Sequence, residues 1–176
     1  TGETSDAVVL VIVDAMRPDH LGAYGYDRPV SPNLDRLARE GVLFTEFFSA
    51  SSWTRPSSAS LLTGLPYQVH GCDAYRALDG EITTLAERFK KAGYRTAAFM
   101  ANPVVSGKFG FGQGFDEMLK LDGPKSAAWS AAPDADELVD RAISWIDKVK
   151  KDKFFLVVFA IDVHDPWRAP KKWRDR

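Results

Sequence analysis

Thr54 is the residue of this sequence whose type and surroundings most clearly permit chemistry. Pro56 suits the first turn of a helix, and Gly64 suits the end of the same helix. We therefore expect a helix that begins at Thr54, preceded by a β-rich run that ends at Ser52 or Trp53. The residues of this helix that we expect to face inward are Ala59, Leu61 and Leu62.

The start of such a helix is a place where an anion binds. Unpaired backbone N–H groups and the positive end of the helix dipole favour a phosphate or sulfate oxyanion there. A threonine hydroxyl at that point can act as a nucleophile on such an ester. A plain N-cap is the commoner role for a threonine in this position. The spacing alone leaves both roles open for Thr54.

Polar side chains also follow three predicted strands. These strands are residues 7–13, 95–101 and 154–161. Asp14 and Asn102 come directly after the first two, and Asp162 and His164 follow the third. The first and third runs are apolar without alternation, which is typical of strands covered on both faces in a parallel sheet flanked by helices. We expect Asp14 to end a central strand, at the carboxyl edge where α/β sheets bind ligands.

Each of these side chains has a chemical role and a plainer one. The Asp14 carboxylate can bind a hard or borderline cation, or cap a turn. The His164 imidazole can contact substrate, act as an acid or bind a metal, or it can be a turn residue. His70, in a loop, can touch substrate, although a lone loop histidine is more often structural.

Four further segments are expected to frame the site. Residues 31–41, 84–92 and 134–151 have the caps and apolar spacing of helices, and residues 42–48 are β-prone. Ser31 is the predicted cap of the first helix, and Leu34, Leu37 and Ala38 its buried stripe. Thr84 and Glu87 form a predicted capping box at the start of the second helix.

The bulk composition sets outer limits on function. The chain has 176 residues, 45% hydrophobic and 27% charged, with a net charge of −1. That is an ordinary globular composition, and the absence of a basic stripe gives no reason to expect nucleic-acid binding. A single cysteine excludes an internal disulfide. We find no membrane-length run and no signal peptide in this sequence, and the cellular compartment stays open.

Three segments together resemble the sulfatase family of the alkaline phosphatase superfamily. Residues 53–64 are similar to its Cys/Ser-x-Pro-Ser-Arg signature followed by Leu-Leu-Thr-Gly, with Thr54 at the nucleophile position. Residues 14–22 resemble its opening metal-binding motif, and residues 31–41 its Thr-Pro-Asn-Leu-Asp-x-Leu-Ala-x-x-Gly helix. The resemblance implies an α/β fold with a mainly parallel sheet sandwiched by helices.

The resemblance also implies roles for individual residues. Asp14 and Thr54 would bind a divalent metal, which is calcium, manganese or zinc, with Asp162 a secondary metal candidate. His164 would contact the transferred group. Asn102 would donate its amide to a phosphoryl oxygen, as an asparagine does in related phosphodiesterases, and His70 would bind substrate.

Four departures from the family pattern favour phosphoryl over sulfuryl chemistry. Thr54 cannot be oxidised to formylglycine, as the sulfatase Cys or Ser is, and Ser58 stands where the signature has arginine. Ala15 replaces a second metal-binding aspartate, and Asn102 lies where sulfatases carry a lysine and a histidine. Threonine nucleophiles are found in the phosphodiesterases and phosphoglycerol transferases of the superfamily.

We therefore expect residues 1–176 to be the N-terminal part of a single sulfatase-like catalytic domain, incomplete at its C-terminus. Its function would be metal-dependent hydrolysis or transfer of sulfate or phosphate esters, with a phosphoester or phosphodiester favoured. The partner would be a small-molecule ester, or one linked to a lipid or glycan. We expect this piece alone to be inactive. The alternative is a non-catalytic fragment or pseudoenzyme that acts as a binding module.

Overall fold

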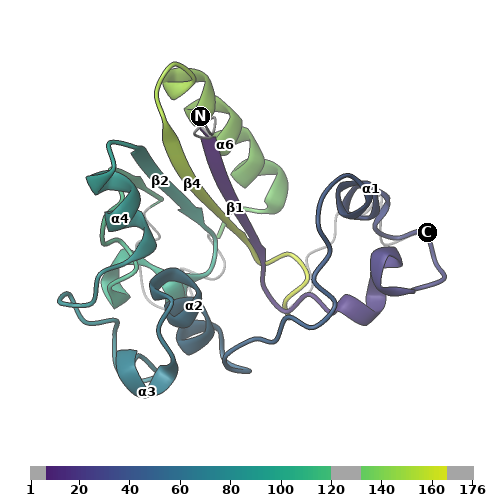
Figure 1. The fold of residues 1–176 in the computed structure, drawn as a ribbon, viewed down its shortest axis with the longest axis horizontal. Coiled ribbons are helices and arrows are strands. Elements are labelled where there is room, and N and C mark those ends of the chain that lie inside the picture. The colour runs from purple at the N-terminus through teal and green to yellow at the C-terminus, as the bar shows by residue number, and fades with distance from the viewer. Residues whose placement is uncertain (1–6, 120–131, 166–176) are drawn as a thin grey trace. The chain divides into compact units, whose positions relative to one another are not determined.

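The computed structural model describes residues 7–119 and 132–165, and the chain separates into two compact units (Figure 1). Residues 15–49 form the smaller unit, and the rest of the described chain forms the larger one. No helix within the described residues is long and apolar enough to cross a membrane.

A parallel four-stranded sheet organises the larger unit. Its order is β1 (Ala7–Val13), β4 (Phe154–Ala160), β2 (Arg95–Met100) and β3 (Glu117–Met118). All three neighbouring pairs are parallel, so the carboxyl ends of the strands meet at one edge. The predicted α/β fold with its parallel sheet is confirmed, and the first three strands lie close to their predicted bounds. The two-residue β3 was not foreseen.

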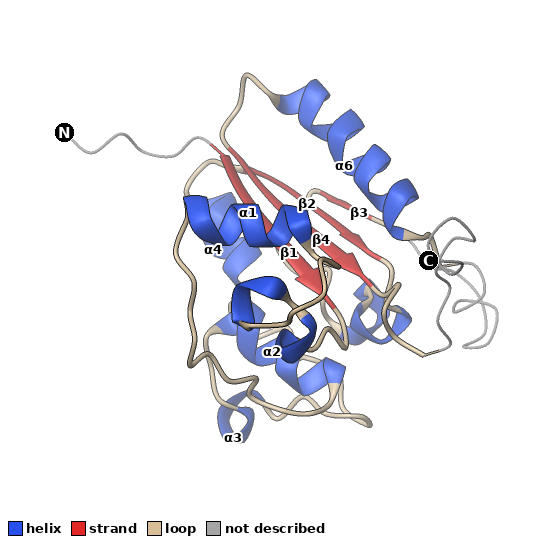
Figure 2. Cartoon of the chain, turned by 90° about the vertical axis from the view of Figure 1, so that its right-hand side faces the viewer, coloured by secondary structure: helices blue, strands red, loops and turns tan. Residues whose placement is uncertain are grey.

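Helices cover both faces of this sheet (Figure 2). On one face, α6 (Ala135–Val149) packs Leu138 and Trp145 against the side chains of β2 and β4. On the other, Phe89 of α4 (Leu85–Lys91) stacks on the fully buried Phe155, and α2 (Thr54–Thr63) contributes Ala59 and Leu62 to the same buried cluster. Burying a side chain of this size contributes about 1.5–3 kcal/mol. The sheet edge that carries the site is therefore held from both sides.

Strand β1 is an edge strand within the described chain, which corrects the expectation that it is central and covered on both faces. Val9 and Val11 are 47% and 62% exposed. They lie on the same sheet face as α6, but that helix packs over β2 and β4 and not over β1. The apolar run was a correct sign of a strand and an incorrect sign of two-sided burial.

Local chemistry explains where the helices begin. At α4, Thr84 accepts from the backbone N–H of Glu87, and the Glu87 carboxylate accepts from the N–H of Thr84, so the predicted capping box is present. At α6, Asp134 caps the helix by accepting from the N–H of Glu137. In α2, Ala59 and Leu62 are buried as expected, but Leu61 is 40% exposed.

Gly114 lies in the loop that precedes β3 and makes a close approach to α4. Its φ is +83°, and a Cβ there would lie 2.2 Å from the backbone nitrogen of Glu87. Only glycine fits both the left-handed backbone and the contact. This loop therefore packs directly against the backbone at the start of α4.

The smaller unit contains α1 (Pro32–Glu40) and the short 3₁₀ helices η1 (Pro18–His20) and η2 (Gly22–Tyr24). Ser31 takes the N-cap position of α1, but its hydroxyl makes no cap bond: it donates to Asp35 and accepts from the N–H of Gly22. Asp35 also accepts from the N–H of Ala23. These bonds link α1 to η2.

Two expectations for the smaller unit are wrong. Leu34 and Leu37 are 41% and 63% exposed, because no other described element of this unit covers that side of α1. Residues 42–48 form no strand, and Val42 and Phe48 are 80% and 85% exposed. A β-prone segment needs a neighbouring strand to complete its ladder, and this one has none among the described residues.

Candidate active site

Thr54 is the first residue of α2, and its hydroxyl faces a carboxylate. The N-cap position belongs to Trp53, whose side chain makes no cap bond. Thr54 Oγ1 donates to Asp14, with its oxygen 3.2 Å from Oδ2 and 3.4 Å from Oδ1. The plain N-cap role is therefore excluded by the structure, and the hydroxyl is placed for chemistry.

Asp14 is held at the carboxyl edge of the sheet by its own backbone. Its N–H donates to the carbonyl of Ala160 at 2.9 Å, which extends the pairing of β1 with β4 by one residue. The next residue, Ala15, has a left-handed backbone with φ of +58°. For a residue other than glycine this conformation costs about 1–2 kcal/mol. The chain therefore turns sharply just after the carboxylate.

Asn102 meets the same carboxylate from the end of β2. Its side chain is 1% exposed, and its Nδ2 donates to Asp14 Oδ2 at 2.6 Å. Its Oδ1 accepts from the N–H of Val104 at 3.0 Å. The structure thus brings together three of the predicted site residues, Asp14, Thr54 and Asn102. Contact between Asn102 and a phosphoryl oxygen stays a prediction.

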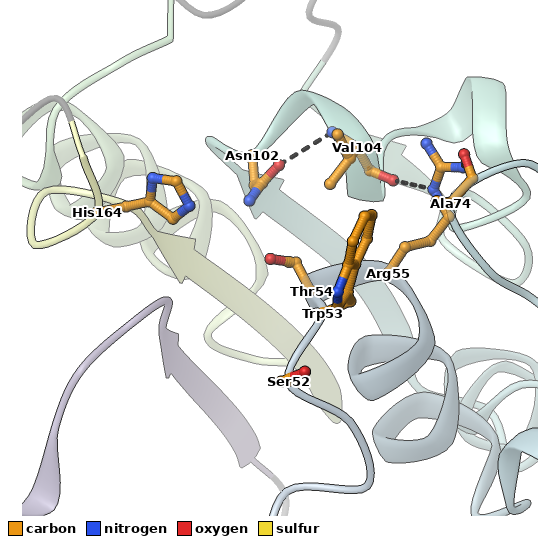
Figure 3. Close-up of a pocket in the computed structure, with 8 residues that line it drawn as sticks. All are labelled: Ser52, Trp53, Thr54, Arg55, Ala74, Asn102, Val104 and His164. Atoms are coloured by element: carbon orange, nitrogen blue, oxygen red, sulfur yellow. Dashed lines mark hydrogen bonds between the residues drawn. The ribbon is translucent and has the colours of Figure 1, made fainter.

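A cavity of about 370 Å³ opens beside Thr54 (Figure 3). Asn102 and His164 line it together with Thr54, and Trp53 and Arg55 flank the threonine in sequence and line it as well. The indole of Trp53 is 62% exposed. The cavity has the size of a small-molecule site.

Arg55 is a residue that sequence reasoning missed. It is 6% exposed, and its guanidinium donates to three backbone carbonyls: Nε to Val104 at 3.1 Å, and Nη1 to Asp73 and Ala74 at 2.9 and 2.8 Å. It also lies 3.8 Å above the centre of the Phe109 ring. A cation in the first turn of a helix opposes the helix dipole. This unfavourable placement was the sequence signal that Arg55 has a specific role. Among the ion pairs of the described residues, none involves Arg55.

His164 lines the cavity from the loop after β4. Its backbone N–H donates to the carbonyl of Ile161 at 2.9 Å. Its Nδ1 lies 2.6 Å from the carbonyl oxygen of Asp165, and because a carbonyl only accepts, Nδ1 carries a proton in this arrangement. His164 thus shares the cavity with Thr54, and its contact with the transferred group stays a prediction.

Asp162 binds the backbone at the start of α6. Its Oδ1 accepts from the N–H of Ala135 at 3.0 Å, while its Oδ2 is buried without a hydrogen-bond partner among the described residues. It is not among the residues that line the cavity. An orphaned carboxylate oxygen suits a cation or a proton. Its role as a metal ligand stays a prediction.

The metal donors present are incomplete. Within residues 7–119 and 132–165, no group of three or more His, Cys, Asp or Glu residues lies close enough to hold an ion. Asp14 and Thr54 supply oxygen donors, whereas protein zinc sites usually need three or four ligands. These residues fit one side of a divalent-metal site and not a whole one.

His70 lies away from the cavity, in α3 (Tyr67–His70). It is 4% exposed, its Nδ1 accepts from the N–H of Cys72 at 3.0 Å, and its Nε2 lies 2.9 Å from Ser60 Oγ. Because Nδ1 accepts, the neutral ring carries its proton on Nε2 and donates it to Ser60. Burial lowers the pKa of His70. This environment gives no support to the substrate-binding role predicted for it.

Similar proteins agree with the motif resemblance. An arylsulfatase of Clostridium perfringens is 41% identical over 93 residues, which cover 51% of this chain and 19% of that protein. An N-acetylglucosamine-6-O-sulfatase of Bacteroides thetaiotaomicron is 25% identical over 167 residues, covering 86% of this chain and 29% of that protein. The chain therefore spans less than a third of these curated relatives.

Solved structures share the fold. A protein solved in complex with its substrate D-glucosamine-2-N,6-O-disulfate has a TM-score of 0.77 at 23% identity, over 92% of this chain and 35% of that one. A phosphonate monoester hydrolase of Agrobacterium radiobacter has a TM-score of 0.75 at 22% identity, over 96% and 43%. The C-terminal periplasmic domain of EcEptC from Escherichia coli, solved with zinc, has a TM-score of 0.72 at 19% identity, over 97% and 48%.

The family assignment does not depend on any one of these proteins. The model of the family described as Sulfatase matches residues 6–176, nearly the whole chain. With the parallel sheet and the Asp14–Thr54 pair at its carboxyl edge, this match shows that the chain belongs to the sulfatase family.

Proposed function

We propose that the intact protein cleaves sulfate or phosphate esters, or transfers their acid group, with Thr54 as the nucleophile. The observation that carries this proposal is the hydrogen bond from the Thr54 hydroxyl to Asp14 at the mouth of a cavity. A hydroxyl whose hydrogen is held by a carboxylate presents an oxygen lone pair to an incoming electrophile. The bond supports the role of nucleophile, which the family resemblance suggested.

The reaction would begin with attack of Thr54 Oγ1 on the sulfur or phosphorus atom. A bond forms between this oxygen and the central atom, the ester bond to the alcohol breaks, and the hydroxyl proton passes toward Asp14. The departing alkoxide takes a proton from Nε2 of a doubly protonated His164, whose ring lines the same cavity and keeps its Nδ1 proton on the Asp165 carbonyl. Water then cleaves the covalent threonine ester and releases sulfate or phosphate. An acceptor alcohol in place of that water gives a transferase.

The negative oxygens of the transferred group would lie against the start of α2. The first N–H groups of a helix lack partners within it, and here they belong to Thr54 and Arg55. The helix dipole and the charge of Arg55, 6% exposed and next to the nucleophile, both favour an anion. This support takes the place of the arginine that Ser58 replaces.

A divalent metal belongs to the proposal but not to the steps above. Asp14 and Thr54 would hold it, with ligands outside the described residues completing the set. When bound, it would lower the pKa of the hydroxyl and neutralise charge on the transferred group. Calcium, manganese and zinc all remain candidates, with Asp162 as a further ligand.

A phosphoester or phosphodiester is the favoured substrate. A threonine cannot yield formylglycine, so the hydration route of the sulfatase aldehyde is closed to Thr54. The names of the sequence relatives favour a sulfate ester instead. The name of one structural neighbour favours a phosphonate monoester. A lipid- or glycan-linked ester is compatible with the exposed Trp53 at the cavity.

The alternative is a pseudoenzyme that binds such esters without cleaving them. The incomplete metal donors of the described residues favour it. Calorimetric titration of the intact protein with zinc, manganese and calcium separates the two proposals, because an enzyme of this kind binds metal through Asp14 and a pseudoenzyme does not.

The decisive experiment compares the intact protein with its Thr54→Ala and Thr63→Ala variants. Aryl sulfate, aryl phosphate and aryl phosphodiester are each assayed with the three metals, and acid-quenched protein is examined by peptide mass spectrometry. We expect turnover, and a sulfuryl or phosphoryl group on Thr54, in the parent and in Thr63→Ala. Thr63 is the matched control because it ends the same helix and donates to Ala59. An active Thr54→Ala protein would overturn the assignment.

A further inference from the structure

Four hydrogen bonds beside the cavity connect Thr54 to Arg55, the next residue in the chain, by way of three other residues, and so form a ring. Thr54 donates to Asp14, and Asn102 donates to the same carboxylate. The N–H of Val104 donates to Asn102, and Arg55 donates to the carbonyl of Val104. Because Arg55 directly follows Thr54, the ring closes through one peptide bond. Figure 3 shows its two links through Val104.

The ring fixes which way the Asn102 amide points. Its oxygen accepts from Val104, so its nitrogen must face Asp14. A flipped amide would place its oxygen against the carboxylate and its NH₂ group against the N–H of Val104, and both bonds would be lost. At 1% exposure, water cannot replace them. The amide therefore has one stable orientation.

Arg55 fixes the other side of the ring. Its three donated bonds join the start of α2 to two separate segments, the loop at Asp73 and Ala74 and the 3₁₀ helix η3 (Pro103–Val105). A lysine ammonium is a compact point charge and does not reproduce the fixed fork of a guanidinium. Backbone carbonyls and the Phe109 ring satisfy the charge without a carboxylate among the described residues. The guanidinium thus holds Val104, whose N–H orients the Asn102 side chain.

We infer that Asn102 and Arg55 are positioning residues for the nucleophile. Asn102 holds Asp14 Oδ2, Arg55 holds the carbonyl of Val104, the residue whose N–H orients Asn102, and together they set the carboxylate that the Thr54 hydroxyl faces. The inference rests on the proposed function of Thr54. It assigns the two residues to the geometry of the attacking oxygen, with no contact to substrate required.

Steady-state kinetics of the intact protein test this inference with Asn102→Ala, Arg55→Lys and the double variant. We expect each single change to lower kcat about 10–100-fold, the usual effect of losing a partner that orients a reactive group. KM and inhibition by inorganic phosphate or sulfate should change less than about threefold, because binding of the anion is left in place. The double variant should lose much less than the product of the single losses, since either change opens the same ring.

Matched controls are Asn33→Ala and Arg141→Lys, which make the same chemical changes at exposed positions and should keep kcat. Melting temperatures are measured for all variants, and if Arg55→Lys does not fold, Asn102→Ala decides alone. Parent kcat in Asn102→Ala, or single losses that multiply in the double variant, would overturn the inference. Parent activity in Thr54→Ala would instead overturn the proposed function, so the two failures are distinguishable.

Discussion

The two ends of helix α2 carry polar groups that look alike in sequence and differ in structure. At its start, the Thr54 hydroxyl faces Asp14 and a cavity. Near its end, Ser60 pairs with His70, whose second ring nitrogen is occupied by the N–H of Cys72. One pair lies beside a cavity, and the other is enclosed within the protein.

The difference leads us to expect that hydrogen-bond saturation, more than residue type, decides which of these residues is reactive and which is structural. His70 has the chemistry of a catalytic group, but both ring nitrogens are occupied and the ring is buried. Thr54 has weaker intrinsic reactivity, but its environment leaves the oxygen facing a cavity. We therefore expect changes at the start of α2 to alter turnover, and changes near its end to alter stability.

The largest expected effect is at the start of the helix, with Asp14→Asn. The amide keeps the shape of the carboxylate but cannot take the hydroxyl proton, so kcat should fall about 10²–10⁴-fold. Thermal unfolding should change little. Turnover with an aryl phosphate measures the first and calorimetry the second. Near-parent turnover in Asp14→Asn would remove the distinction between the two ends.

The reverse behaviour is expected near the other end, with His70→Ala. The change leaves the N–H of Cys72 without its acceptor and opens a cavity in the core, which should cost about 2–4 kcal/mol of unfolding free energy. The kcat of the folded protein should stay at the parent value. Urea unfolding and kinetics below the transition measure the two. A fall in kcat with unchanged stability would restore His70 to the site.

Acid should weaken the closed pair without any substitution. The pKa of His70 is lowered by burial, so at mildly acidic pH the unfolded chain binds more protons than the folded one. The stability that the neutral, buried His70 contributes is fully present above about pH 6.5, the ordinary pKa of imidazole. It is lost as the pH falls from there through the lower pKa of His70 in the folded protein. Urea midpoints across this range should decline in the parent and less steeply in His70→Gln. Equal slopes in both would show that another group is responsible.

The smallest effect is expected from Trp53→Ser at the N-cap of α2. The indole makes no cap bond, whereas a serine hydroxyl can accept from the N–H of Arg55, the second residue of the helix, so unfolding free energy should rise by about 1 kcal/mol. Loss of the indole from the cavity should raise KM for aryl substrates in the same variant. Calorimetry and initial rates would show whether stability and binding are opposed at this position. A destabilised variant would show that the indole contributes packing that outweighs the cap.

The sequence was sufficient for features that depend on local chemistry. Thr84 and Glu87 predicted the start of α4, and Asp134 with the acidic residues after it predicted the start of α6. The strand ends placed Asp14 and Asn102 at one edge, because parallel strands share their carboxyl side. These signals lie within a few residues of the feature they predict.

The rest depended on distant partners. An apolar strand has the same residue pattern at the edge of a sheet as at its centre. The sequence therefore could not predict the exposure of Val9 and Val11. The β-prone residues 42–48 lacked a ladder partner in the described chain. Arg55 was missed because its three acceptors are carbonyls, which every residue carries. Such partners leave no mark on the residue types.

The pairing of β1 with β4 also has a consequence for the order of folding. Ala7 is aligned with Phe154, so β1 cannot gain its partner until the chain through β4 has been synthesised. Pairing over such a sequence separation is slow, because loop closure must precede the contacts that reward it. Asp14 reaches Thr54 only when that step is complete. The Asp14–Thr54 pair is thus assembled late, and a chain released before β4 would lack the strand that holds Asp14 in place.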